Sequence, residues 1–254
     1  MSGISLQSGI IYGPVFSRRL GRSLGINLLP TTHKLCSFDC IYCQYGRGQG
    51  TSLVPNGDVL PTIDQVLSAV ERALKKPRTL DYLTFSGNGE PTIHPGFSTI
   101  VEGVIELRDK IRPGAKVAVL SNSSRVTDAE VLSVLKLVYA PMMKLDAGDE
   151  ETFNLINRPS RSINLQEILG SLREIPNLVI QSAFIDGNIT NIRGDAFHAW
   201  VAALQLIEPK LVHIYSAERP TADESVLCVS PKKLKGIADA LNRQYGLNVK
   251  AFWS

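Results

Sequence analysis

Short apolar runs alternate along the chain with longer segments in which apolar residues recur at helical spacing. The apolar runs predict strands at residues 25–29, 82–85, 117–120, 139–146, 179–184, 211–215 and 249–252. The segments between them predict helices at residues 62–76, 97–107, 128–137, 150–156, 165–173, 196–206 and 231–245. Strands joined by helical crossovers pair in parallel, and such crossovers are right-handed. The order of the elements therefore predicts an α/β fold, an open partial (βα)6 barrel with parallel strands.

Two of the expected helices carry signals at their first residues. Thr62 is placed to cap the helix in which Val66, Val70 and Leu74 recur every four residues. Pro231 stands in the first turn of the last helix, where a missing N–H removes no helical hydrogen bond. We expect these two helices to begin at Thr62 and Pro231.

Two of the expected strands carry polar side chains near their carboxyl ends. In residues 139–146, Lys144 and Asp146 share one face, which alternation turns into the barrel. In residues 211–215, His213 and Tyr215 share the inward face, and Val212 and Ile214 are expected to pack on helices. Lys144, Asp146, His213 and Tyr215 are therefore candidate catalytic residues. The alternatives are an ion pair on the rim for Lys144 and Asp146, and a structural role for His213.

Composition and length favour one ordinary globular unit. The chain is 44% hydrophobic and 20% charged, and its length suits a single α/β domain over residues 1–254, with a core at about 10–220 and a C-terminal extension at 221–254. The formal charge of +3 neither argues for nucleic acid nor excludes it. Neither a signal peptide nor an apolar run long enough for a membrane span is apparent, so we expect a cytoplasmic protein without a membrane partner.

Three of the four cysteines crowd into eight residues. Cys36, Cys40 and Cys43 have the spacing C-x3-C-x2-C, and clustered thiolates select zinc, copper(I) or iron–sulfur centres. Closed zinc sites and cubane clusters use four ligands, so three cysteines leave one metal position open. A reducing compartment is expected, because an oxidising one would compete for these thiolates. Cys228 is far away in sequence and is expected to be a buried thiol.

Two polar turns follow the second and third expected strands. Gly87, Asn88, Gly89 and Glu90 come directly after residues 82–85; the glycines allow the backbone close to a ligand, and the glutamate supplies a carboxylate. The turn Ser121-Asn122-Ser123 follows residues 117–120. This second turn is either a ligand contact or a plain N-capping turn.

The cysteine spacing followed by the Gly-Asn-Gly-Glu turn resembles the radical S-adenosylmethionine (SAM) superfamily. The resemblance implies that Cys36, Cys40 and Cys43 hold a [4Fe–4S] cluster whose open iron binds SAM. It also implies that an electron donor such as flavodoxin or ferredoxin reduces the cluster. The other residues that match motifs of the family are Tyr42 beside the adenine, Gly87, Asn88, Gly89 and Glu90 at the amino group, and Ser121, Asn122 and Ser123 at the ribose or carboxylate.

Within the superfamily, residues 17–25 and the turn after residues 82–85 look most like the group of wyosine-forming tRNA enzymes. Those enzymes convert N1-methylguanosine in tRNA to a tricyclic base with pyruvate, and they hold a second cluster on another cysteine triplet. Here only Cys228 remains outside the first triplet. The chain therefore resembles a short, single-cluster relative of that group.

Three functions stay open at this point. The first is radical chemistry on a small molecule or peptide. The second is the same chemistry on tRNA, in which case a rim of arginines would contact phosphates. The alternative for Arg18, Arg19 and Arg22 is a solvated loop. The third is a metal-binding module without catalysis. The arginines of the expected rim are Arg18, Arg19, Arg22, Arg158 and Arg161.

Overall fold

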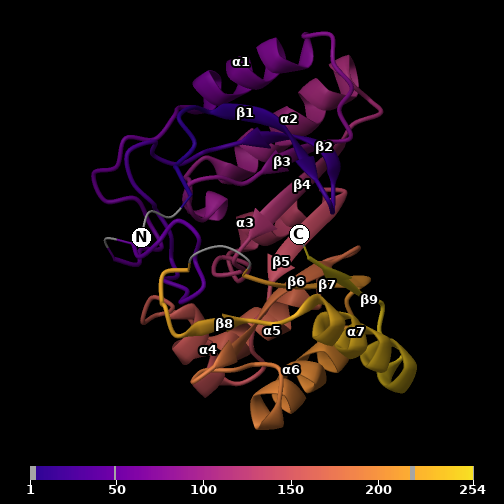
Figure 1. Ribbon diagram of the computed structural model, residues 1–254. Coiled ribbons are helices and arrows are strands. Elements are labelled where there is room, and N and C mark those ends of the chain that lie inside the picture. The colour runs from indigo at the N-terminus through magenta and orange to yellow at the C-terminus, as the bar shows by residue number, and fades with distance from the viewer. Residues whose placement is uncertain (1–3, 49, 218–220, 254) are drawn as a thin grey trace.

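The computed structural model describes residues 4–48, 50–217 and 221–253. They form one curved sheet with helices along its outer side (Figure 1). The strand order is β1-β2-β3-β4-β5-β6-β7-β9, and β8 pairs with β6. Strand β1 is antiparallel to β2, and each later neighbour along this order is parallel to the one before it. The sheet does not close on itself, and the predicted α/β, open partial barrel is confirmed.

The strands are β1 (Ile11–Ser17), β2 (Gly21–Ile26), β3 (Tyr82–Phe85), β4 (Lys116–Ser121), β5 (Ala140–Lys144), β6 (Val179–Gly187), β7 (Leu211–Ser216), β8 (Val226–Cys228) and β9 (Val249–Phe252). The helices are α1 (Ile63–Leu74), η1 (Pro91–Ile93), α2 (Phe97–Ile111), α3 (Ala129–Leu135), α4 (Glu150–Asn157), α5 (Leu165–Leu172), α6 (Gly194–Ile207) and α7 (Pro231–Tyr245). Among the described residues, no helix is both long and apolar enough to cross a membrane.

Most of the expected elements lie within a few residues of the observed ones. Thr62 caps α1 in a capping box with Gln65, and Pro231 opens α7 behind the N-cap Ser230, as predicted. The first parallel strand is a correction, because it spans Gly21–Ile26 and not 25–29. Asn27 ends it by folding its side chain onto the backbone of Leu29.

Strands β1 and β8 were not expected from the sequence. Strand β1 contains Gly13 and Pro14, which both weaken a strand signal, and most of its residues are exposed. Strand β8 is only three residues long. Both therefore lack the apolar run on which the other strands were recognised.

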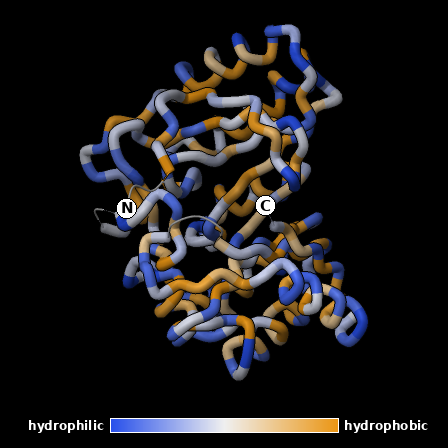
Figure 2. Tube along the Cα trace, in the orientation of Figure 1, coloured by the Kyte–Doolittle hydropathy of each residue, from blue (hydrophilic) through white to orange (hydrophobic). Residues whose placement is uncertain are grey.

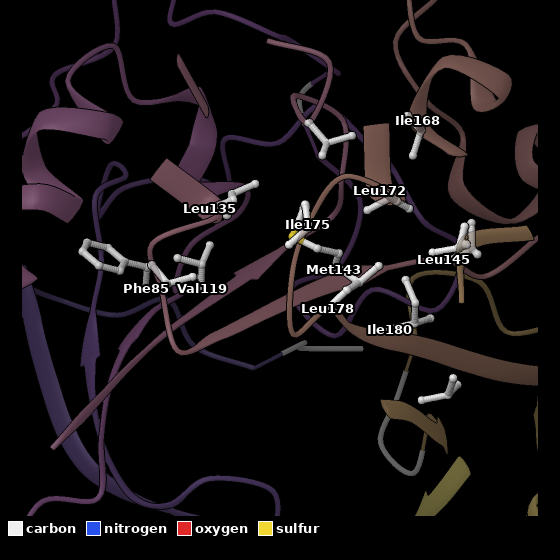
Figure 3. Close-up of a cluster of buried hydrophobic side chains, with 14 of the residues drawn as sticks. Phe85, Val119, Leu135, Met143, Leu145, Ile168, Leu172, Ile175, Leu178 and Ile180 are labelled. Carbon is white, nitrogen blue, oxygen red and sulfur yellow. The ribbon is translucent and has the colours of Figure 1, made fainter. Parts of the chain in front are cut away.

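The hydrophobic core lies between the sheet and the helices that cover it. The buried side chains of β3 to β6 meet α3 and α5 there (Figure 3). Val212 and Ile214 belong to this core, so the expected outward face of β7 is confirmed. Figure 2 shows that hydrophobic residues concentrate in the strands, whereas hydrophilic residues predominate on the outer turns and loops.

Near the amino ends of the strands, the inner face of the sheet is packed with hydrophobic side chains. Leu20, in the turn between β1 and β2, inserts there and contacts a small group of buried side chains that belong to β4, β5 and β6. The members of that group are Ala118, Ala140, Met142 and Val179. Beyond these side chains, towards the carboxyl ends of the strands, the barrel interior is available for a binding site.

The cysteine-rich loop after β2 is seated on the turn after β3 by backbone pairing. Leu35 forms a parallel bridge with Gly89: its N–H donates to Asn88 O at 3.0 Å, and its carbonyl accepts from Glu90 N at 3.0 Å. On the other side, Phe38 forms a bridge with Pro159. The loop is thus held between two segments that are distant in sequence.

A side chain at Gly89 would disrupt this seat. A Cβ there would lie 1.7 Å from the Leu35 carbonyl oxygen, and the φ of +142° is one that side chains rarely adopt. We expect Gly89→Ala to lower the free energy of unfolding by about 2–4 kcal/mol, measured by urea unfolding.

The matched control is Gly170→Ala in α5, where a Cβ meets no atom within 4 Å. There the same substitution should stabilise the protein by about 0.5–1 kcal/mol. Equal unfolding midpoints for the two variants would contradict the importance of the Leu35–Gly89 pairing.

Candidate functional site

A cavity of about 590 Å³ occupies the barrel interior between the cysteine loop and β7. Ten of the candidate catalytic, cofactor-binding and metal-binding residues line it: Cys36, Tyr42, Cys43, Gly87, Gly89, Glu90, Ser121, Asn122, Lys144 and Tyr215. Five others do not line it: Cys40, Asn88, Ser123, Asp146 and His213. The motifs therefore converge on one cavity, but not every motif residue reaches its surface.

Each of the three clustered thiols receives a hydrogen bond from a side-chain N–H group. The distances are 3.5 Å from Asn122 Nδ2 to Cys36 Sγ, 3.4 Å from Asn157 Nδ2 to Cys40 Sγ, and 3.7 Å from Lys34 Nζ to Cys43 Sγ. None of these cysteines forms a disulfide. Such donors favour sulfur atoms that carry negative charge, as metal-bound thiolates do.

Burial and neighbouring negative charge raise the pKa values of two of the clustered thiols. Burial, followed by the neighbouring Cys40 and Glu90, raises the pKa of Cys36, and burial with Asp146 raises that of Cys40 to about 11. A cationic metal centre lowers the pKa of the cysteines that bind it, so these cysteines bind as thiolates. Within the described residues, no three Cys, His, Asp or Glu side chains converge on one metal ion. In a cubane each cysteine binds a different iron, so its ligands need not converge in that way.

Lys34 is the cation of the cysteine loop. Its side chain is 5% exposed, and its ammonium group also donates to Asp39 Oδ1 at 3.3 Å and to Gly46 O at 2.8 Å. Burial lowers its pKa, but Cys43, Cys36 and Asp39 outweigh burial and raise it. The lysine therefore stays protonated beside the sulfur atoms.

Glu90 forms part of the cavity wall, although it is almost fully buried. Its Oε1 accepts from Thr92 N at 3.1 Å and from the Thr92 hydroxyl at 2.7 Å, and its Oε2 accepts from Asn122 N at 2.5 Å. Burial raises its pKa, and these hydrogen bonds oppose that rise. The carboxylate is thus fixed in place and can accept from a cationic ligand group.

Asn88 has a different position from its glycine neighbours. It is fully buried, and its amide group pairs with the backbone of Gln7 and donates to Pro30 O at 2.8 Å. The asparagine therefore ties the turn after β3 to the N-terminal segment and to the loop after β2. The close approach that requires Gly89 is likewise to Leu35, within the protein, and not to a ligand.

Asp146 is buried behind the cavity wall and organises it. Its carboxylate accepts from the Tyr42 hydroxyl at 2.5 Å, from Asn157 Nδ2 at 2.7 Å and from Ala183 N at 2.7 Å, and it lies 3.2 Å from Lys144 Nζ. Asp146 and Lys144 therefore form an ion pair, but it is buried and not on the rim; Lys144 lines the cavity, and Asp146 does not. Asp146 holds Tyr42 and Asn157 at the cysteine loop.

Lys144 reaches the cavity from the end of β5. Its Nζ donates to the Tyr215 hydroxyl at 2.6 Å and lies 4.7 Å from the centroid of the Tyr42 ring. Burial lowers its pKa, but Asp146 and Tyr215 outweigh burial and raise it well above the usual value. The amine is therefore protonated at neutral pH.

His213, Ser123 and Cys228 lie away from the cavity surface. His213 packs edge to face on Phe252, and burial followed by nearby positive charge lowers its pKa to about 4, so it is neutral. Ser123 has a φ of +74° and donates to Lys144 O at 2.8 Å. Cys228 is exposed in β8, not buried as expected; β8 is a short strand that pairs with β6 alone.

The five arginines do not lie on one rim, which corrects the expected basic surface. Arg18 and Arg19 line the cavity from the turn between β1 and β2. Arg22 pairs with Asp81 where β2 begins, at the opposite end from the cysteine loop. Arg158 pairs with Asp223, and Arg161 is exposed.

Lys34, Asn157 and Gln181 are functional candidates that sequence reasoning missed. Lys34 lies two residues before Cys36, so its proximity to the motif was an available signal. Asn157 and Gln181 lie in helical and strand patterns that carry no such signal. Only the fold brings them to the site.

Comparison with known proteins gives matches over most of the chain. The profile of the Radical SAM superfamily matches residues 31–207. The protein "GTPase Obg" of Brachyspira hyodysenteriae is 27% identical over 91% of this chain and 33% of its own length. The UPF0026 protein MJ1312 of Methanocaldococcus jannaschii is 38% identical over 63% of this chain and 47% of its own length. The chain thus spans about a third to a half of these curated relatives.

Among solved structures, TYW1 with a lysine–pyruvate adduct bound has a TM-score of 0.59 and 16% identity, over 88% of this chain and 74% of that one. A likeness at this identity concerns the fold, which is a partial barrel in both. The superfamily profile covers more than half of the chain, including the cysteine loop and the turn after β3. The chain belongs to the radical SAM superfamily.

Proposed function

We propose that the protein is an enzyme that holds a [4Fe–4S] cluster on Cys36, Cys40 and Cys43 and binds SAM in the adjoining cavity. The observation that carries this proposal is the seating of the cysteine loop on the turn after β3, which brings Cys36, Cys43 and Glu90 to one cavity. When bound, the cluster would supply the electron that splits SAM into methionine and a 5′-deoxyadenosyl radical, which removes hydrogen from a substrate.

The chain's own residues would bind and orient SAM. Glu90 offers a fixed carboxylate to its amino group, and Tyr42 offers an aromatic ring that Asp146 holds in position. Ser121 and Asn122 line the same wall. Such fixed groups keep the reacting atoms close and exclude water. The electron would come from a small donor protein such as flavodoxin or ferredoxin.

We propose that one domain carries the whole site. The segment after β7 supports this, because β9 continues the sheet and Phe252 lines the cavity. The substrate of this domain would be a small molecule or a peptide segment, since a cavity of about 590 Å³ is in the size range of small-ligand sites.

RNA is a second candidate substrate, favoured by one observation. Phe16 is 85% exposed at the cavity wall, close in sequence to Arg18. Exposed aromatic rings beside cations stack on unpaired bases and contact phosphates. If RNA is the substrate, the affinity for bulk tRNA should fall steeply with rising salt and with Phe16→Ala. An affinity that changes with neither salt nor Phe16→Ala would exclude RNA as the substrate.

The cluster and its chemistry can be tested together. After anaerobic reconstitution, we expect about four irons per chain and release of 5′-deoxyadenosine from SAM with dithionite. Cys36→Ala, Cys40→Ala and Cys43→Ala should each lose the cluster and the product. Cys228→Ala, at an exposed position, should keep both. Bound zinc and no SAM cleavage would instead favour a metal-binding module.

Lys34 should raise the reduction potential of the cluster, because a buried cation stabilises the added electron. We expect Lys34→Met to lower the midpoint potential in an EPR-monitored redox titration, at unchanged iron content. Lys136→Met is the control, since Lys136 pairs with Glu174 on the surface. Equal potentials for Lys34→Met and the wild type would contradict this role.

A further inference from the structure

The part of the cavity bounded by β5, β6 and β7 is lined by hydrogen-bond donors. Lys144 and Gln181 are register partners on β5 and β6 and both face the cavity. Tyr215 on β7 and Arg19, from the turn between β1 and β2, complete this group. These four side chains are called the donor group below.

Arg19 carries a positive charge without an acidic partner. Its guanidinium donates to Gln181 Oε1 at 2.7 Å and lies 5.0 Å from the centroid of the Tyr215 ring. Over the described part of the chain, no carboxylate lies within ion-pair distance of Arg19. By contrast, Arg22 and Arg158 each pair with an aspartate. A half-buried cation in a cavity wall without a counter-charge is arranged to meet an anion.

Gln181 and Tyr215 add donors whose hydrogens have no acceptor. Gln181 is 4% exposed, its oxygen is taken by Arg19, and its Nε2 has no partner among the described residues. Lys144 donates to the Tyr215 oxygen, which leaves the hydroxyl hydrogen of Tyr215 available. A buried N–H group without an acceptor is unfavourable, so the site is completed only by a ligand with acceptor atoms.

We propose that the donor group binds an oxyanion, a carboxylate or a phosphate, that belongs to the substrate. Arg19 supplies the unpaired charge, and the Gln181 amide and Tyr215 hydroxyl supply neutral hydrogen bonds. Lys144 is partly neutralised by Asp146 and orients Tyr215. The inference rests on the proposed function, since it names the chemical class of the substrate of the same cavity. In this proposal the anion and SAM occupy different parts of the same cavity.

Calorimetric titration of the reconstituted, SAM-loaded protein with inorganic phosphate, and separately with acetate, tests the proposal. Saturable binding of at least one probe is expected, and the tighter probe identifies the phosphate or the carboxylate as the substrate group. Arg19→Gln should weaken binding at least about 10-fold, because a charge-assisted contact is lost. Arg19→Lys should recover part of the affinity.

Arg22→Gln is the matched control, because it removes an arginine charge three residues away that pairs with Asp81 outside the cavity. Its affinity for the probes should equal that of the wild type. The proposal is overturned if neither probe binds, or if Arg19→Gln binds the probes as tightly as the wild type does. It is also overturned if the probes bind the SAM-free protein but not the SAM-loaded protein, because SAM's own carboxylate would then be the anion. Release of 5′-deoxyadenosine by the wild type reports separately on the proposed function.

Discussion

The site depends on the backbone pairing between Leu35 and the turn after β3. Two hydrogen bonds of 3.0 Å join the segments, and the pairing is possible only because Gly89 has no side chain. It places the cysteine loop across the carboxyl end of the barrel, where Cys36 and Glu90 face one cavity. The glycine is therefore required by the packing of the protein on itself, whatever ligand binds beside it.

A second constraint fixes the other side of the cysteine loop. Asp146 is buried and accepts hydrogen bonds from Tyr42 and Asn157, and Asn157 in turn donates to the sulfur of Cys40. The carboxylate thus connects the loop to β5 and, through the backbone of Ala183, to β6. Because Lys144 balances its charge, the Asp146 carboxylate can remain buried without being an unpaired ion.

The sequence predicted the fold well, and it placed the cysteine and glycine motifs at the carboxyl ends of strands, because both predictions depend on local patterns. Apolar runs identified six parallel strands in order, and the cysteine and glycine motifs follow the first two of these strands. The role of Asn88 was not predictable in this way, because its partners, Gln7 and Pro30, are about 60 to 80 residues distant in sequence. The same holds for Gln181, whose partner Arg19 lies in a turn that inserts across the barrel.

The distribution of charge in the cavity sets what can bind where. Cys36, Cys43 and the carboxylate of Glu90 line one end of the cavity, so under the proposed function that end suits a ligand with both a metal-binding group and a cationic group. Arg19 and Gln181 present only donors, so their end suits an anion. A substrate whose anionic group is held there would extend from the donor group towards the wall of Glu90, Ser121 and Asn122, where SAM is proposed to bind, and its reacting carbon would lie between the two. Specificity for the substrate would then depend on the distance between its anionic group and that carbon, because strands β5 to β7 fix the position of the donor group.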